Sequence, residues 1–244
     1  MSKRVAIVQS NYIPWKGYFD LIAGVDEFIL FDDVQYTRRD WRNRNKIIVD
    51  GVPQWLTIPV AVSGKYYQKI NETRIDDETW RRSHLSAIDR AYRCHPAHAE
   101  VWPWLTECYD RASSVMLSEV NETLIRAMCE RLDINTRISR SSDYDVIDGK
   151  SERLMSLCTQ AGASVYVSGP AARAYLDEPV FAQAGIEVRW KCYDAYPPYA
   201  QIMPVFEHGV SILDLFFSMG SEAAAYIHST PFDVPHMQPD ELYA

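Results

Sequence analysis

The feature that most constrains the fold is a pair of short apolar segments near the start of the chain, separated by a helical pattern. The segments are RVAIVQS (residues 4–10) and EFILFDD (27–33), and each ends in polar residues. Strands buried on both faces of a sheet have this continuous apolar character. Between them, residues 12–26 hold a loop with Pro14 and Gly17, followed by an apolar helical face. Two parallel strands joined by one helix predict an α/β fold.

The rest of the chain extends this prediction to a mostly parallel sheet of about five strands. Further strands are expected in residues 135–144, 163–169 and 186–194, with helices in 151–162, 170–176, 209–220 and 221–227. Two β-rich runs within residues 45–62 flank Asp50-Gly51, a dipeptide that favours a β-hairpin. Residues 77–133 place apolar side chains three and four positions apart, which indicates a helical insertion. The expected organisation is an N-terminal half of the α/β domain with a basic loop and hairpin (1–76), the insertion (77–133), the C-terminal half (134–230) and a tail (231–244).

Composition is typical of a soluble globular protein. The 244 residues are 47 % hydrophobic and 24 % charged, and no run of about 18 apolar residues or signal-peptide pattern occurs. We therefore expect a cytoplasmic protein. The five cysteines are widely spaced and fit reduced thiols better than disulfides or a zinc site. The net charge of −8 argues against affinity of the whole surface for nucleic acid or anionic membranes, so a local basic patch needs a local explanation.

The loop after the first expected strand is a candidate binding site. Ligands of parallel α/β sheets bind at the carboxyl ends of the strands, where Gln9, Asn11, Lys16 and Gly17 would lie. The loop resembles the strand-loop-helix of the class I synthetase and nucleotidyltransferase (HUP-like) superfamily, although Lys16-Gly17 stand where that superfamily has histidines. Neither GxGxxG nor GxxxxGK[ST] occurs in the chain. The alternative is a structural turn packed on Trp15.

Asp32 and Asp33 follow the second expected strand at the same edge of the sheet. Adjacent side chains on extended backbone point in different directions, so we expect one to face the cleft and the other to cap or pair with arginines. A cleft carboxylate could act as a general base, a magnesium ligand or an anion that binds an amine. A charge-balanced strand end is the alternative.

The segment YTRRDWRNRNK (36–46) carries five cations around Asp40 and Trp41. It could be a solvated charge run, a nucleic-acid patch with Trp41 and Tyr36 as stacking platforms, or a pocket in which two or three arginines clamp a phosphorylated small molecule. Position next to the two aspartates favours a pocket.

Residues 166–177 repeat the strand-loop-helix pattern. Ser168-Gly169 form the turn, and Arg173 lies in the first turn of the expected helix, which could bind an anion or be an ordinary βα turn. His95 and His98 do not have a recognised metal-ligand spacing, so no metal site is expected. The chain also has no G-x-S-x-G motif of a serine hydrolase.

Several of these segments together resemble the WbqC-like protein family of bacteria. They are QSNYIPWKGYFDLI, DEFILFDDVQYTRRDWRNRNKI, WLTIPV, YVSGPAARAYLD and SILDLFFSMG, which span about residues 4 to 220. Members of this family tend to lie among genes for O-antigen and other surface polysaccharides, and the resemblance implies a role in decorating an amino sugar, with glycyl transfer as the suggested reaction. The positions that it implies are Gln9, Asn11, Lys16, Gly17, Asp32, Asp33, Gln35, Tyr36, Arg39, Trp41, Arg42, Asn43, Arg44, Ser168, Gly169 and Arg173.

The resulting hypothesis is a transferase that joins an amino acid or small acyl group to the amine of a nucleotide-linked amino sugar. Asp32 or Asp33 would be the base, and Lys16 with Asn11 would stabilise charge on the acyl donor. A free carboxylate needs activation, so ATP with magnesium or a preactivated donor is expected. The alternative hypothesis is a protein that binds or modifies nucleic acid through the basic segment.

Overall fold

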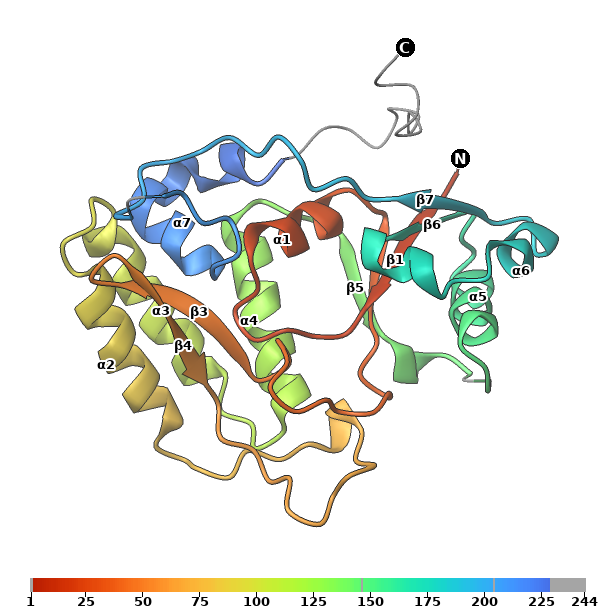
Figure 1. Cartoon of the computed structure of the whole chain (residues 1–244), viewed down its shortest axis with the longest axis horizontal. Coiled ribbons are helices and arrows are strands. Elements are labelled where there is room, and N and C mark those ends of the chain that lie inside the picture. Colours follow the sequence, from red (N-terminus) through yellow and green to blue (C-terminus); the bar gives the residue numbers. More distant parts are fainter. Residues whose placement is uncertain (1, 146, 204, 229–244) are drawn as a thin grey trace.

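The computed structural model describes residues 2–145, 147–203 and 205–228. Its centre is a five-stranded sheet in the order β5-β2-β1-β6-β7 (Figure 1). Every strand pair in this sheet is parallel. The strands are β1 (Arg4–Val8), β2 (Glu27–Leu30), β5 (Arg137–Arg140), β6 (Val165–Ser168) and β7 (Glu187–Trp190). The prediction of an α/β fold with a parallel sheet of about five strands is confirmed.

The order of the strands reverses at β1. Helix α1 (Lys16–Ala23) leads from β1 to β2 on one side, whereas the chain that leaves β5 through α5 (Ser151–Gln160) enters β6 on the other side of β1. Helix α6 (Glu178–Gln183) then connects β6 to β7. A strand with such neighbours is a topological switch point, and ligands of open α/β sheets bind outside the carboxyl ends of the strands there. The loops that follow β1, β2 and β6 are therefore the first place to look for a site.

The predicted hairpin is also confirmed and is separate from the main sheet. It consists of β3 (Arg44–Val49) and β4 (Val52–Thr57), which pair antiparallel. Asp50 and Gly51 at its turn have φ values of 50° and 75°. A two-residue hairpin turn of this kind needs positive φ at both positions, which explains the Asp-Gly dipeptide.

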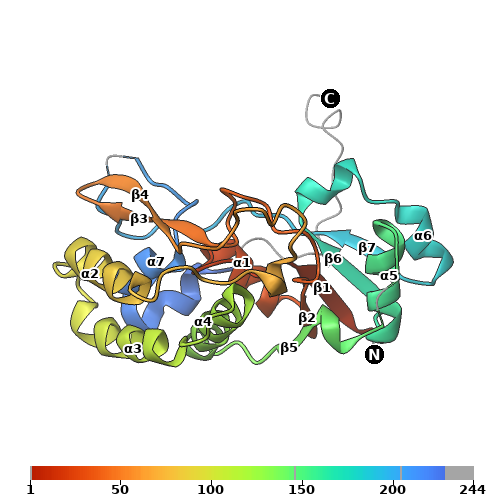
Figure 2. The same ribbon diagram turned by 90° about the horizontal axis from the view of Figure 1, so that it is seen from below.

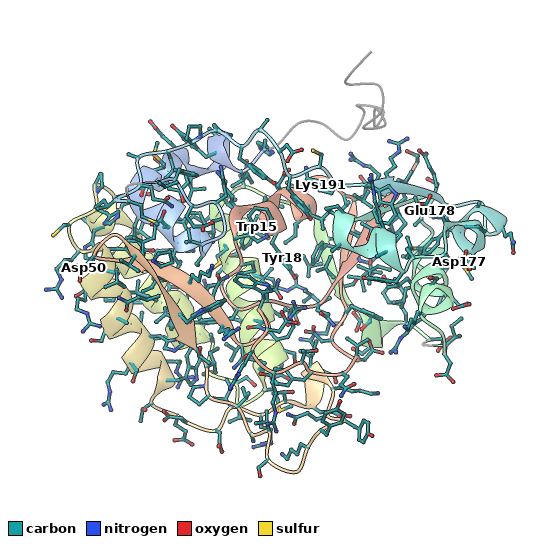
Figure 3. The ribbon with its side chains drawn as sticks, viewed as in Figure 1. Trp15, Tyr18, Asp50, Asp177, Glu178 and Lys191 are labelled. Carbon is teal, nitrogen blue, oxygen red and sulfur yellow. The ribbon has the colours of Figure 1, made fainter. Side chains whose placement is uncertain are left out.

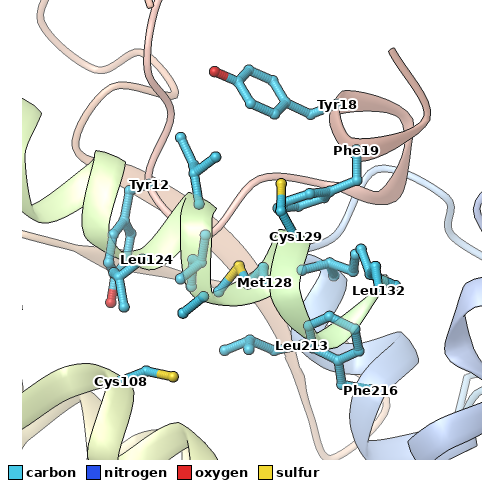
Figure 4. Close-up of a cluster of buried hydrophobic side chains, with 14 of the residues drawn as sticks. Tyr12, Tyr18, Phe19, Cys108, Leu124, Met128, Cys129, Leu132, Leu213 and Phe216 are labelled. Atoms are coloured by element: carbon cyan, nitrogen blue, oxygen red, sulfur yellow. The ribbon is translucent and has the colours of Figure 1, made fainter. Parts of the chain in front are cut away.

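Helices from the second quarter of the chain and from near its end pack together beside the sheet (Figure 2). They are α2 (Trp80–Tyr92), α3 (His98–Arg111), α4 (Leu117–Arg131) and α7 (Ile212–Met219). One buried hydrophobic cluster joins α4 and α7 to α1 and to the sheet. In Figure 4, Met128 of α4 lies between Phe19 of α1 and Leu213 of α7. The expected insertion therefore shares its core with the α/β sheet.

Two helices that the sequence predicts in residues 170–176 and 221–227 are 3-10 helices, η3 (Pro170–Ala174) and η4 (Gly220–Tyr226). Short helical segments often take this tighter form, because few hydrogen bonds are available to stabilise an α-helix. The sequence reading missed α6 and the single-turn helices η1 (Ile70–Glu72) and η2 (Ser141–Asp143). The expected tail, residues 231–244, lies outside the described residues. Within the described part of the chain, none of the helices has both the length and the apolar character needed to span a bilayer.

Candidate functional site

The loops that leave β1 and β2 bring a buried carboxyl group to the carboxyl edge of the sheet. Val8 and Leu30 are paired at the ends of these strands, so the residues that follow them are neighbours. Asp32 Oδ1 accepts a hydrogen bond from the Ser10 backbone N–H at 2.8 Å. Only 7 % of the Asp32 surface is exposed. Asp32 therefore sits inside the edge of the sheet, where sequence reasoning expects a ligand.

Burial is the main influence on the Asp32 carboxyl group and raises its pKa to about 6. The hydrogen bond from Ser10 and the positive charge of Arg42 lower the pKa, and the negative charge of Glu122 raises it further. Desolvation disfavours the charged form of a carboxyl group, which is why burial dominates. A carboxylate with a pKa near neutrality can accept a proton from a substrate and release it again.

Arg42, from the middle of the basic segment, is buried beside this group. Its guanidinium donates to Gln9 Oε1 and lies 3.7 Å from Asp40. Asn121 of α4 donates to the Arg42 carbonyl at 2.8 Å and to the Ser10 hydroxyl at 3.1 Å. The Nε atom of Arg42 is buried and has no hydrogen-bond acceptor among the described residues. These contacts fix the basic segment to the end of β1, and they leave one guanidinium donor unused.

A cavity of about 170 Å³ adjoins Asp32 between the ends of β2 and β5 and the start of α4. It is lined by Leu30, Asp32, Asp33, Asn71, Ser118, Glu119, Glu122, Arg140, Ser141 and Ser142.

Two of the carboxylates in this cavity are neutralised. Asp33 accepts hydrogen bonds from Ser141 and from the guanidinium of Arg153 on α5. Glu122 is paired with Arg126 at 2.8 Å and with Arg140 at 2.6 Å.

Asp32, by contrast, belongs to none of the ion pairs that the described residues form. Asn71 also lines the cavity, and its Oδ1 is buried without a donor among the described residues. An ammonium group carries one positive charge and up to three N–H donors. Asp32 and Asn71 therefore offer a charge and a hydrogen-bond acceptor that suit a substrate amine.

The other part of the basic segment forms an aromatic surface with the hairpin. The rings of Trp41 and Trp55 lie 5.2 Å apart, and the Arg44 guanidinium lies 4.0 Å above the Trp55 ring. Arg44 also donates to the Arg39 carbonyl. Both indoles are partly exposed. Flat aromatic rings beside a guanidinium can stack on a sugar or base and bind an anion at the same time.

Lys16 is held away from the Asp32 cavity by a different set of contacts. Its ammonium lies 4.9, 5.3 and 5.4 Å from the ring centres of Tyr196, Tyr199 and Phe206, and it donates to the Pro197 carbonyl at 3.3 Å. Burial lowers the Lys16 pKa to about 8. The structure thus places the predicted stabiliser of the acyl donor in an aromatic box formed by the segment that follows β7.

That same segment covers the switch point between β1 and β6. A Cβ atom on Gly169 would lie 3.6 Å from the Tyr193 hydroxyl, and the Tyr193 ring packs 5.2 Å from Trp15. Trp15 in turn explains Gly17, since a Cβ at that position would come within 2.3 Å of the indole. Figure 3 labels Trp15, next to Tyr18 in the middle of the molecule. Ser168, the last residue of β6, is buried.

The remaining predicted residues lie in several different parts of the structure. Asn43 donates to the Ile58 carbonyl at 2.8 Å, and Gln35 donates to the Tyr66 carbonyl at 2.8 Å. Burial raises the pKa of Tyr36, whose ring is not open to stacking. Arg173 lies over the Trp190 ring at 5.2 Å. Asn11 carries a buried Oδ1 that has no donor among the described residues.

Of the predicted residues, the structure therefore brings together Gln9, Asp32, Asp33 and Arg42, with Trp41 and Arg44 on the adjoining surface. Sequence reasoning missed Ser10, Asn71, Asn121, Glu122 and Arg140. A signal for two of these exists in the sequence, because Asn121 and Glu122 are polar residues on a buried helical face between Val120 and Leu124. Within the described residues, no group of three or more His, Cys, Asp and Glu side chains could hold a metal ion.

Comparison with known proteins adds a family but no activity. The model of the WbqC-like protein family matches residues 9–226. An uncharacterized protein of Mycobacterium tuberculosis (strain ATCC 25618 / H37Rv), Rv1507c, is 52 % identical over 225 residues, which cover 92 % of this chain and 97 % of that protein. No solved structure matches the chain, so the resemblance to the HUP-like layout stays a prediction.

Proposed function

The chain belongs to the WbqC-like protein family, and from that premise and the Asp32 cavity we propose that it is a cytoplasmic transferase. The proposed reaction joins an amino acid, such as glycine, or another small acyl group to the amine of a nucleotide-linked amino sugar. Such a step would serve the assembly of surface polysaccharides.

The observation that carries the proposal is the state of Asp32. It lines a small cavity, it lies outside the ion pairs of the described residues, and burial raises its pKa to about 6. An ammonium group that enters the cavity would pair with the ionised carboxylate. Asp33 and Glu122, the two other buried carboxylates that line this cavity, already have arginine partners. We therefore assign the base to Asp32 and a structural role to Asp33.

In the proposed reaction the amine nitrogen attacks the carbonyl carbon of an activated acyl donor. Asp32 first accepts one proton from the bound ammonium, which frees the lone pair of the amine. A C–N bond then forms, the bond from the carbonyl carbon to the leaving group breaks with its electron pair going to the leaving group, and the second proton lost by the nitrogen goes to the leaving group or to water. A free carboxylate is too poor an acyl donor for this step, so the donor arrives preactivated or is activated with ATP and magnesium.

The Trp41, Arg44 and Trp55 surface supports recognition of the nucleotide. An aromatic face suits a base or a sugar ring, and the Arg44 guanidinium suits a pyrophosphate. Recognition of nucleic acid would use the same cations. Burial of Arg42 and stacking of Arg44 on Trp55 favour a compact ligand over an extended strand.

A thermal-shift screen with nucleotide-linked amino sugars, with and without ATP, tests the binding step. A ligand at 100 times its dissociation constant adds about 2.7 kcal/mol of stability. The Arg44→Ala variant should weaken this binding about tenfold or more, because a hydrogen bond to a charged group is lost. Absence of a response to every nucleotide sugar would count against the proposal.

Turnover kinetics test the role of Asp32. The Asp32→Asn variant should bind the nucleotide sugar and lose a factor of about 10² to 10⁴ in kcat, which is the usual contribution of a general base. Asp76→Asn is a matched control, since Asp76 is an exposed carboxylate outside the cavity. Full activity of Asp32→Asn would refute the assignment.

A further inference from the structure

A loop on the edge of the molecule exposes two tyrosines that no part of the proposed reaction uses. Tyr66 and Tyr67 are 74 % and 83 % exposed, and their rings meet edge to face with centres 4.9 Å apart. The loop that carries them, residues 61–69, is drawn in orange at the lower edge of Figure 1. Large aromatic side chains gathered on a surface mark an interaction site more often than solitary ones do.

Hydrogen bonds hold the backbone of this loop in place. The Tyr66 carbonyl accepts from Gln35 at 2.8 Å, and Gln68 donates to the Ala61 carbonyl at 3.0 Å. The Lys65 N–H bonds to the Val62 carbonyl at 3.3 Å. The backbone is therefore anchored while both tyrosine rings point into solvent, so the loop presents them without needing to fold on a partner.

Cations lie in this loop and in the segment next to it, although the chain as a whole has a net charge of −8. Arg38 donates to the Val62 carbonyl at 2.7 Å, which places its exposed guanidinium at the foot of the loop. Lys69 lies opposite Gln35 in an antiparallel bridge. We call the exposed residues of this region the loop-tip face: Arg38, Arg39, Lys65, Tyr66, Tyr67 and Lys69.

The acidic residues near this face leave its charge positive. Asp40 accepts from the Trp41 backbone N–H at 2.7 Å and lies beside Arg42. Glu72 accepts from the Lys69 backbone N–H at 3.0 Å. Four cations thus stand against two carboxylates, and both carboxylates are directed toward the protein's own backbone.

We propose that the loop-tip face binds the anionic lipid surface of a membrane. Tyrosine rings are amphipathic and favour the headgroup region of a bilayer, and lysine and arginine side chains are attracted to anionic headgroups. A projecting tip suits a flat surface. Single-stranded nucleic acid is bound in grooves that track the backbone, and a projecting loop is the opposite shape. The contact is peripheral, and the proposal does not depend on the transferase activity.

Sedimentation with lipid vesicles tests this inference on the whole protein. The protein should sediment with vesicles of equal parts phosphatidylglycerol and phosphatidylcholine at low salt, sediment less at about 0.15 M salt, and stay in solution with phosphatidylcholine alone. Each cation removed, in Lys65→Ala and in Lys65→Ala/Lys69→Ala, should weaken vesicle binding about fivefold.

The aromatic part is tested by Tyr66→Ser/Tyr67→Ser, which should also weaken vesicle binding. Tyr175→Ser is the matched control, because Tyr175 is 60 % exposed and lies outside the loop-tip face. Unchanged urea unfolding midpoints of these surface variants establish that they are folded.

Three results would overturn the inference. The first is no sedimentation with phosphatidylglycerol vesicles at low salt, and the second is equal sedimentation of the parent protein and both double variants. The third is a protein that binds a single-stranded oligonucleotide at about 0.15 M salt but does not bind vesicles, with the oligonucleotide binding abolished in Lys65→Ala/Lys69→Ala. That pattern would assign the face to nucleic acid.

Discussion

Replacement of Asp32 by asparagine should make the folded protein more stable at neutral pH while it removes the proposed base. Asparagine keeps an oxygen that can accept the hydrogen bond from the Ser10 N–H, and it carries no charge that must be buried. The ionised carboxylate of Asp32 destabilises the folded state, because burial raises its pKa from 3.8 to about 6.

The size of the effect follows from that difference in pKa. Each pKa unit corresponds to about 1.4 kcal/mol, so the ionised form of Asp32 costs the folded state about 3 kcal/mol at pH 8. The folded protein holds the proton more tightly than the unfolded chain does. The contribution of Asp32 to stability is therefore most favourable below pH 3.8 and is lost as the pH rises through about 6.

Urea unfolding of the parent protein and Asp32→Asn at several pH values measures this difference. The variant should be more stable by up to about 3 kcal/mol at pH 8, less the cost of burying the new amide N–H groups, and its advantage should shrink steadily as the pH falls toward 4. Asp76→Asn should show no such trend, since Asp76 is exposed. A variant that is less stable than the parent at pH 8, with a difference independent of pH, would show that the Asp32 carboxylate is a stabilising partner of Arg42 and would refute the reasoning.

Three further changes probe the core and the site. His84 accepts from the Tyr12 hydroxyl at 2.7 Å and donates to the Thr57 carbonyl at 3.1 Å, and burial lowers its pKa from 6.5 to about 4. Its contribution to stability should fall by about 2 kcal/mol between pH 7 and pH 5, because the unfolded chain binds the proton first, and urea unfolding of His84→Gln should lack this part of the pH dependence. Arg153→Ala leaves Asp33 buried without its cation and should destabilise the protein by about 3–5 kcal/mol in urea unfolding, whereas a loss below 1 kcal/mol would mean that the ion pair is solvated. Gly17→Ala places a methyl group within 2.3 Å of the Trp15 ring and should cost about 1–3 kcal/mol with a change in Trp fluorescence, and an unchanged unfolding midpoint would contradict the packing of Trp15.

The parts of the structure that could be predicted are those with a local signal. Continuous apolar runs identify β1 and β2, and the Asp50-Gly51 turn identifies the hairpin. The position of Asp32 two residues after the end of β2 was enough to place it at the ligand edge, because parallel strands end at the same edge.

The unpredicted parts depend on contacts between distant segments. Lys16 is enclosed by the rings of Tyr196, Tyr199 and Phe206. The described residues of that stretch form no helix or strand, so it has no periodic pattern to read. Asn121 reaches the site across 111 residues of sequence to bond Ser10. The sequence could not decide whether Asp32 or Asp33 is the proposed base. The choice depends on Arg153 of α5, which pairs with Asp33 and leaves Asp32 without a cation partner among the described residues.

The most direct test of the proposed function is the proton balance of substrate binding. Titration calorimetry at pH 6 in two buffers of different ionisation enthalpy measures the protons released when a nucleotide-linked amino sugar binds. Pairing with the ammonium should ionise Asp32, so about half a proton should be released by the parent protein and none by Asp32→Asn. Equal affinity for the N-acetylated sugar, with no proton released, would contradict an amine in the Asp32 cavity.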